Sequence, residues 1–282
     1  MDETNVLLKI ESKKHDFTKT EKTLAKYILK EYSRIVYMSI TELADKLKVS
    51  EGTIVRFCQK LGFTGFHPFK INLAVTQRSI EESGELFDIE KGDMKTLKHF
   101  VAKRNTEMIE NTKAFISEES LSTSLSLLKN AKQILVAGLG ASGNTAGDCY
   151  YKFLRLGLNC KRTVDAHLQA MLASQLTQED VLVAISQSGS TLEIVDIADN
   201  AKKAGAKVIS ITGYERSPLV KFSDVVLLTP TKETPFESGA IRSKIAQLFV
   251  IELLFSALYI DMKKEGITNI KKTADAVAKW IY

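Results

Sequence analysis

The sequence predicts an all-helical N-terminal domain followed by an α/β doubly wound domain with a five-stranded parallel sheet. Two patterns along the 282 residues support this class. Residues 17–77 carry apolar side chains at helical spacing, with turn signals between the runs. From residue 133 onward, short β-rich runs alternate with segments long enough to be helices, which is the pattern of parallel βαβ units.

Start and stop signals place the first helices of the N-terminal domain. Two of them begin with Ser or Thr followed three residues later by Glu, which is the capping box that satisfies the first backbone N–H groups of a helix. Ser50 is placed to begin the next helix, and Gly62 to end it. The two capping pairs are Thr18 with Glu21 and Ser39 with Glu42.

The C-terminal region contains five β-rich runs that are apolar on both faces. Such strands are typical of a parallel sheet that helices cover on each side. A helical pattern precedes them at 96–130, and two helices are expected after them, at 239–262 and at about 266–281. The five runs are residues 133–138, 158–164, 180–186, 206–212 and 224–229.

Composition changes between the two regions. Residues 78–95 lose their periodicity and are rich in charge, Ser and Gly, which is typical of a linker. We therefore predict an N-terminal domain at 1–77 and a C-terminal domain with flanking helices at 96–282.

The basic excess of the chain lies entirely in its first 80 residues. These contain 14 Lys and Arg against 9 Asp and Glu, while the other 202 residues hold 25 of each. A basic N-terminal domain favours nucleic acid as its partner.

We expect a cytoplasmic protein with no membrane span and no metal ion. The most apolar stretch, residues 245–260, contains Gln247 and Glu252 and is shorter than the roughly 20 residues that a span needs. The N-terminus lacks a signal-peptide pattern. The three cysteines are odd in number and lack C-x-x-C spacing, which indicates neither a disulfide framework nor a zinc site.

Residues 39–63 fit a helix-turn-helix, whose second helix enters the major groove of DNA. Ala44 is small where the two helices must cross. The guanidinium group of Arg56 can donate two parallel hydrogen bonds to guanine. The alternative is a helical domain that binds no DNA. The candidate DNA contacts are Ser50, Glu51, Thr53, Arg56 and Lys60, with Lys46, Lys48 and Lys70 as further phosphate contacts.

Two glycine-rich turns follow predicted strands of the C-terminal domain. The first, GLGASG at 138–143, fits G-x-G-x-x-G, and Asp165 follows Gly143 by 22 residues. This is the fingerprint of a dinucleotide site, so a nicotinamide-dependent Rossmann oxidoreductase is one alternative.

The second turn, SQSGST at 186–191, argues for a different ligand. A dinucleotide site needs no second cluster of hydroxyl groups, whereas two turns that converge at strand ends suit one small phosphorylated ligand. The backbone N–H groups of residues 189–191 would supply positive potential, and Ser186, Ser188 and Thr191 would supply directed donors. The alternative is that these hydroxyl groups only cap the helix that follows.

The two turns together resemble the phosphosugar-binding SIS (sugar isomerase) domain. Residues 39–70 are similar to the helix-turn-helix of RpiR-type bacterial transcriptional regulators, which carry the two domains in this order. The resemblance implies the SIS fold and a homodimeric or tetrameric regulator that binds operator DNA and senses a sugar phosphate. The implied ligand contacts are Ser142, Ser186, Ser188, Gly189 and Thr191.

SIS-type isomerases and lyases need a general acid or base, so an enzyme of this type is a second alternative. Glu237 and His167 are the candidates for that role, and either could instead bind the hydroxyl groups of the sugar. Because a regulator that consumed its effector would erase its own signal, we expect no catalytic residue and no cofactor.

Overall fold

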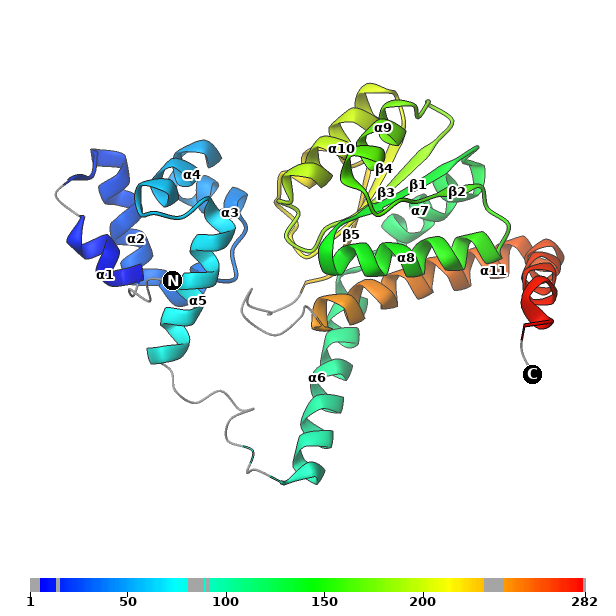
Figure 1. The fold of residues 1–282 in the computed structure, drawn as a ribbon, viewed down its shortest axis with the longest axis horizontal. Coiled ribbons are helices and arrows are strands. Elements are labelled where there is room, and N and C mark those ends of the chain that lie inside the picture. Colours follow the sequence, from blue (N-terminus) through cyan, green and yellow to red (C-terminus); the bar gives the residue numbers. More distant parts are fainter. Residues whose placement is uncertain (1–5, 14–15, 81–88, 90–91, 231–240, 281–282) are drawn as a thin grey trace. The chain divides into compact units, whose positions relative to one another are not determined.

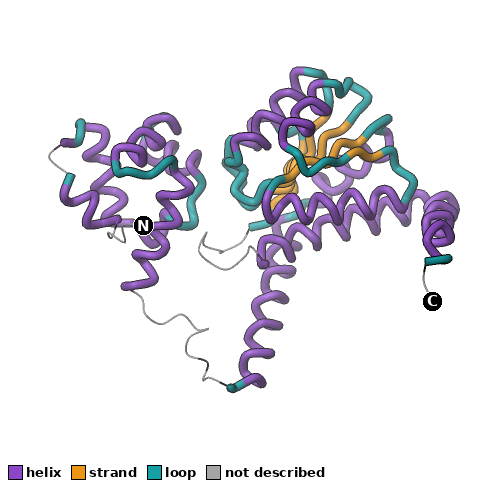
Figure 2. Tube along the Cα trace, viewed as in Figure 1, coloured by secondary structure: helices purple, strands orange, loops and turns teal. Residues whose placement is uncertain are grey.

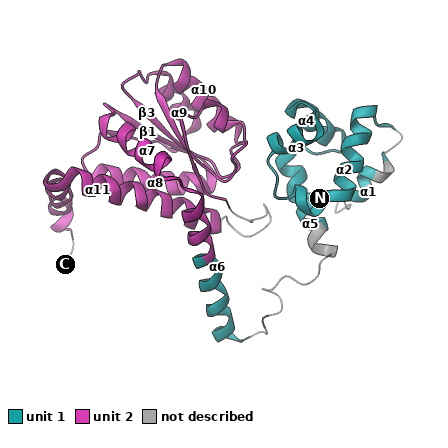
Figure 3. Ribbon diagram, turned by 180° about the vertical axis from the view of Figure 1, so that it is seen from behind, with its two compact units in different colours: residues 1–106, 232–240 teal, residues 107–231, 241–282 magenta. Residues whose placement is uncertain are grey.

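The computed structural model describes residues 6–13, 16–80, 89, 92–230 and 241–280 (Figure 1). The strands gather in one sheet with helices around it (Figure 2). The chain divides into two compact units, which Figure 3 distinguishes by colour. The first comprises residues 1–106 and 232–240, and the second comprises residues 107–231 and 241–282.

The first unit is helical, as predicted for its described residues. Both capping boxes are present, because Thr18 and Ser39 accept from the N–H groups three residues on, and Glu21 and Glu42 accept from theirs in return. Its helices are α1 (Val6–Ser12), α2 (Lys19–Ile35), α3 (Ile40–Leu47), α4 (Glu51–Lys60) and α5 (Phe66–Ile80), with α6 (Met94–Phe115) continuing into the second unit.

The helices of the first unit pack on one apolar core. Phe57 and Phe69 are fully buried in it, together with Leu24 of α2 and Leu43 of α3. The α4 helix ends at Lys60, and Gly62 beyond it has a φ of 91°, a left-handed conformation that favours glycine after a helix. The predicted stop signal is therefore confirmed.

The second unit contains five parallel strands in the order β2-β1-β3-β4-β5, as predicted. The strands are β1 (Ile134–Gly138), β2 (Cys160–Lys161), β3 (Val181–Ile185), β4 (Lys207–Thr212) and β5 (Val225–Leu228). The helices are α7 (Glu118–Asn130), α8 (Gly140–Arg155), α9 (Ala166–Ser174), α10 (Leu192–Lys203) and α11 (Ile241–Ala278), with a short 3-10 helix, η2, at Leu219–Phe222.

Two apolar layers sandwich this sheet. Side chains of α7, α8 and α11 pack on one face, where Phe153 and Leu254 are fully buried. Side chains of α9 and α10 pack on the other face, where Ile194 and Ala198 are fully buried. Because the central strands are apolar on both faces, alternate residues of β1 and β3 enter the two layers.

The two helices expected at the end of the chain form one element with a kink. Lys263 has a φ of 49° and interrupts the helical geometry of α11 at the predicted break. By length and composition alone, α11 could cross a membrane. Val250, Ile251 and Leu254, however, are fully buried against the sheet, as in the core helix of a globular unit.

Lys70, which we expected to contact phosphate, is instead buried. Its exposed fraction is 6%, and its Nζ donates to the backbone carbonyl of Met38 at 2.8 Å. Met38 directly precedes the capping residue Ser39, so Lys70 ties α5 to the start of the helix-turn-helix. Sequence alone gave no indication of this role, because packing of α5 decides it.

We predict a pH-dependent stability from Lys70. Burial lowers the pKa of its ammonium group to about 8, and the Glu42 carboxylate acts in the opposite direction. The unfolded chain retains the proton up to an ordinary pKa of 10.5, so between these values it binds more protons and stability rises with pH. Urea titrations should show the unfolding free energy of the wild type rising relative to Lys70→Met from pH 7.5 to 10.

The comparison with Lys70→Met cancels the other titrating groups, which the two chains share. Loss of the hydrogen bond to Met38 shifts the variant by an amount that does not depend on pH. A constant difference between the two chains across this range would contradict the assignment.

Candidate ligand site and DNA-binding surface

The two glycine-rich turns lie next to each other at one edge of the sheet. Strands β1 and β3 pair in parallel, from Ile134 opposite Val181 to Gly138 opposite Ile185, so both end at the same level. In a sheet of order 2-1-3-4-5, the strand order reverses between these two parallel strands, and ligands bind outside the carboxyl ends of strands at such a point. The predicted convergence of the turns therefore follows from the register.

The first turn depends on close contact between strand and helix. A Cβ at Gly138 would lie 2.7 Å from the carbonyl oxygen of Ser142, so only glycine fits there. The side-chain amide of Gln169, fully buried, both accepts from the N–H of Gly138 and donates to its carbonyl. Ser142 is 8% exposed in the first turn of α8.

The second turn is held by hydrogen bonds among its own residues. Gly189 adopts a φ of 58°, and its N–H donates to the carbonyl of Ser186 at 3.1 Å. The hydroxyl groups of Ser186 and Thr191 are 3.2 Å apart, and the hydroxyl of Ser188 accepts from the N–H of Ser190. The three predicted hydroxyl side chains are thus brought together around one glycine.

These hydroxyl groups do not serve as ordinary helix caps. Thr191 precedes α10 and Leu139 precedes α8, and neither makes a side-chain capping hydrogen bond. The first N–H groups of a helix have no partner within the helix, and they attract anions. Both helices begin beside the turns, so the edge of the sheet offers two such N-terminal ends together with the hydroxyl groups of Ser142, Ser186 and Ser188.

A hydrogen-bonded pair of amides, the buried Gln247 and the partly buried Gln187, connects the two turns, and sequence reasoning missed it. Gln247 of α11 is 1% exposed, and its Nε2 donates to Ser142 Oγ at 3.2 Å and to Gln187 Oε1 at 3.3 Å. Its Oε1 accepts from the hydroxyl of Thr145 at 2.6 Å. The available signal was Gln247 itself, one of the few polar residues in the mostly apolar run 245–260.

Asp165, the acidic residue of the dinucleotide fingerprint, serves as a helix cap. Asp165 caps α9, because its Oδ1 accepts from the N–H of Leu168 at 2.8 Å. The strand order also differs from the 3-2-1-4-5-6 order of the dinucleotide fold. Both observations disfavour the Rossmann oxidoreductase.

Of the two candidate acid–base residues, the structure describes His167 only. His167 lies in the first turn of α9 with its side chain exposed. Glu237 lies outside the described residues, so its role stays a prediction. Within the described part of the chain, no cluster of three His, Cys, Asp or Glu side chains could hold a metal ion.

In the first unit, three of the predicted DNA contacts form a connected row on α4. Ser50 caps the helix, and its hydroxyl lies 2.8 Å from that of Thr53. Arg56 Nη2 in turn donates to the Thr53 hydroxyl at 3.2 Å. The exposed Arg56 is therefore held along the N-terminal part of α4, which is the part of a recognition helix that faces base edges.

The other two predicted contacts are engaged within the unit. Glu51 accepts from the hydroxyl of Thr41 at 2.7 Å, which links α4 to α3. Lys60 pairs with Glu21 at 2.9 Å and donates to the carbonyl of Asp16 at 2.7 Å. Contact between Lys60 and a phosphate group stays a prediction, and it would compete with these bonds.

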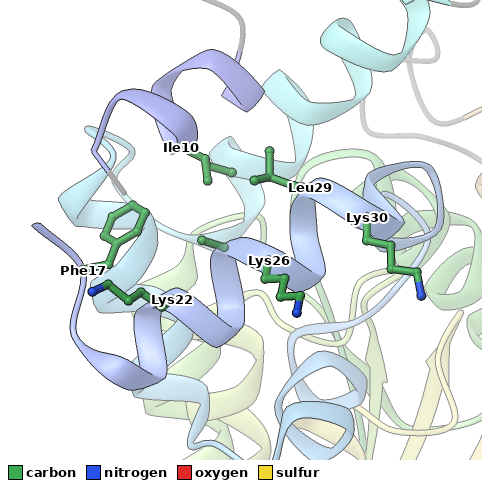
Figure 4. A pocket seen from close by; sticks show the side chains of 7 residues that line it. Ile10, Phe17, Lys22, Lys26, Leu29 and Lys30 are labelled. Carbon is green, nitrogen blue, oxygen red and sulfur yellow. The ribbon is translucent and has the colours of Figure 1, made fainter. Parts of the chain in front are cut away.

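A surface hollow of about 420 Å³ lies in the first unit along α2 (Figure 4). Three lysines spaced four residues apart follow the helix, while Ile10 and Leu29 face each other within the hollow. It has none of the glycine and hydroxyl groups that mark the sheet edge, so the two turns remain the candidate ligand site. The lining residues are Ile10, Phe17, Lys22, Ala25, Lys26, Leu29 and Lys30.

Comparison with known proteins accounts for both units. Residues 4–79 match the model of the helix-turn-helix domain, rpiR family, and residues 127–257 match that of the SIS domain. An HTH-type transcriptional regulator of Clostridium perfringens is 35% identical over 274 residues, covering 96% of this chain and 98% of the relative. The chain belongs to the rpiR family.

Solved structures also match the chain, one of them along nearly its whole length. The Vibrio vulnificus NanR protein complexed with ManNAc-6P matches with a TM-score of 0.84 at 29% identity, covering 98% of this rpiR-family chain and 99% of NanR. The sugar isomerase domain of an RpiR transcription factor from Sphaerobacter thermophilus matches with a TM-score of 0.57 at 16% identity, covering 64% and 98%. The second match shows the shared fold alone.

We predict that the two turns tolerate a methyl group very differently. Gly140 and Gly189 both have left-handed φ values, 56° and 58°, so alanine at either costs about 1–2 kcal/mol of stability. At Gly140 nothing lies within 4 Å of the added Cβ, whereas at Gly189 it would lie 2.1 Å from Ser217 Oγ. Gly189→Ala should therefore lower the melting temperature clearly more than its matched control Gly140→Ala. Equal losses would contradict the tight packing under Gly189.

Proposed function

We propose that this chain is a DNA-binding transcriptional regulator whose SIS domain senses a phosphorylated sugar and modulates operator binding. The observation that carries the proposal is the pairing, in one rpiR-family chain, of a helix-turn-helix with two hydroxyl-lined turns at the β1/β3 edge. The complex of the related NanR protein with ManNAc-6P supports a phosphosugar as the class of effector.

The phosphate group binds between the two turns. Its oxygens accept from the free N–H groups at the start of α8 and α10 and from the hydroxyl groups of Ser142, Ser186, Ser188 and Thr191. Residues 186–191 contain no acid and no base, so the turn holds the phosphate without chemistry of its own. His167 and Glu237 recognise the sugar hydroxyl groups.

On the DNA side, Arg56 contacts a base edge in the major groove, and Ser50 and Thr53 hold its guanidinium in place. The regulator acts in the cytoplasm as a homodimer or tetramer, with half-sites spaced about 34 Å apart or a multiple of that. It turns over no substrate, because consumption of the effector would remove the signal.

A gel shift tests the proposal as a whole. The full-length protein is incubated at low salt with the promoter fragment next to its own gene, with and without a panel of sugar phosphates that includes ManNAc-6-phosphate. We expect a shifted complex whose affinity changes with one member of the panel and with no unphosphorylated sugar. Absence of any complex with DNA would contradict the proposal that the chain is a DNA-binding regulator.

Ser188→Ala should separate sensing from DNA binding. Loss of one hydrogen bond to a charged phosphate corresponds to about 1.5–3 kcal/mol, so the effector concentration for half response should rise about 10- to 100-fold. Operator affinity without effector should stay at the wild-type value. Loss of both properties would mean that Ser188 supports the fold instead of the ligand.

Substitutions of Arg56 should separate base contacts from phosphate contacts. Arg56→Lys keeps the positive charge but loses the planar guanidinium group that can donate two hydrogen bonds to one base. It should therefore weaken binding to the operator more than binding to random DNA. Lys203→Gln removes one charge from the second unit and serves as the control. Equal weakening on both DNAs by Arg56→Lys would assign the residue to a phosphate.

A further inference from the structure

The amides of the partly buried Gln187 and the buried Gln247 form a chain of hydrogen bonds. The contact of Gln187 with Thr229 fixes the orientation of both amides. Gln187 Nε2 donates to the backbone carbonyl of Thr229 at 2.9 Å, just beyond β5. A carbonyl oxygen can only accept, so the amide nitrogen of Gln187 must face Thr229. Its Oε1 therefore faces the Thr229 hydroxyl at 3.1 Å and Gln247 Nε2 at 3.3 Å.

The orientation of the Gln187 amide determines that of the Gln247 amide, which in turn determines whether Ser142 receives a donor or an acceptor. Because Gln187 presents an oxygen, Gln247 must present its nitrogen, and the same nitrogen reaches Ser142 Oγ at 3.2 Å. The remaining Oε1 of Gln247 accepts from the Thr145 hydroxyl at 2.6 Å. Reversal of the Gln247 amide would place its oxygen against Gln187 Oε1, which is also an acceptor.

The contact with Gln247 determines how the Ser142 hydroxyl can hydrogen-bond. Its oxygen accepts from Gln247, so its single proton is available to donate. Among the residues that the structure describes, none accepts that proton. Ser142 lies in the first turn of α8, beside the proposed phosphate position.

We propose that Gln247 is a positioning residue that directs the Ser142 hydroxyl proton toward the phosphate group of the effector. The inference rests on the proposed function and deepens it, because it connects the ligand turns with α11. Gln247 lies three residues before Val250 and four before Ile251, which pack in the core against the sheet. The hydrogen bond between Gln247 and Ser142 thus links the proposed phosphate site to α11 through one side chain.

A double-mutant cycle tests this role, with inorganic phosphate as the probe and its binding to the full chain followed by ³¹P NMR titration. Gln247→Met keeps the volume and removes the donor, and Ser142→Ala removes the hydroxyl. Each should weaken phosphate binding about tenfold. If Gln247 acts through Ser142, the double variant should bind phosphate about as well as Ser142→Ala alone.

A second variant keeps the test decisive if Gln247→Met does not fold. In Gln247→Glu, the carboxylate accepts the Ser142 proton, so phosphate binding relative to the wild type should be weak at pH 8. It should recover as the pH falls and the carboxyl group becomes protonated. The new carboxylate also repels the phosphate directly, and this repulsion persists without the Ser142 hydroxyl. In a Ser142→Ala background the pH dependence should therefore shrink to that of the repulsion alone.

Three results would overturn the inference: unchanged phosphate binding in Gln247→Met, losses that add in the double variant, or a pH dependence in Gln247→Glu that is the same with and without the Ser142 hydroxyl. They leave the proposed function intact as long as the wild type still binds a sugar phosphate that alters its DNA affinity. If the wild type binds no phosphate at all, the proposed function and this inference fail together.

Discussion

The parallel register of β1 and β3 is the constraint on which the second unit depends. Pairing of Gly138 with Ile185 ends both parallel strands at the same level, at the point where the strand order of the sheet reverses. The turns after these strands, and the N-terminal ends of α8 and α10, must then lie side by side. A slip of one residue would turn the apolar side chains of β3 to the opposite faces and separate the turns.

The site at this edge combines rigid backbone with neutral donors. Gly138 allows α8 to approach its strand, and Gly189 packs against the buried Ser217 beneath the second turn. The buried amide of Gln247 then joins the turns to α11. A site built in this way binds an anion through N–H and O–H groups whose positions are fixed before the ligand arrives, which limits the entropy lost on binding.

Local signals in the sequence predicted the parts that local interactions decide. The capping pairs Thr18–Glu21 and Ser39–Glu42 and the five β-rich runs depend on neighbours in the chain, and the structure has all of them. The partners of Lys60, Lys70 and Gln247 depend on residues far away in the sequence, so they could not be predicted. A lysine on a basic domain looks like a phosphate contact until packing shows that its ammonium group is buried, as for Lys70 beside Met38.

Thermodynamic linkage between operator DNA and the sugar phosphate is the decisive property of an effector-controlled regulator. If a sugar phosphate changes the affinity for operator DNA by some factor, the operator must change the affinity for that sugar phosphate by the same factor. Fluorescence anisotropy with labelled operator, and calorimetry of the sugar phosphate with and without operator, measure the two factors under one buffer condition. We expect equal factors of about 5–150. A sugar phosphate that binds the turns without any effect on operator affinity would contradict the proposed regulation.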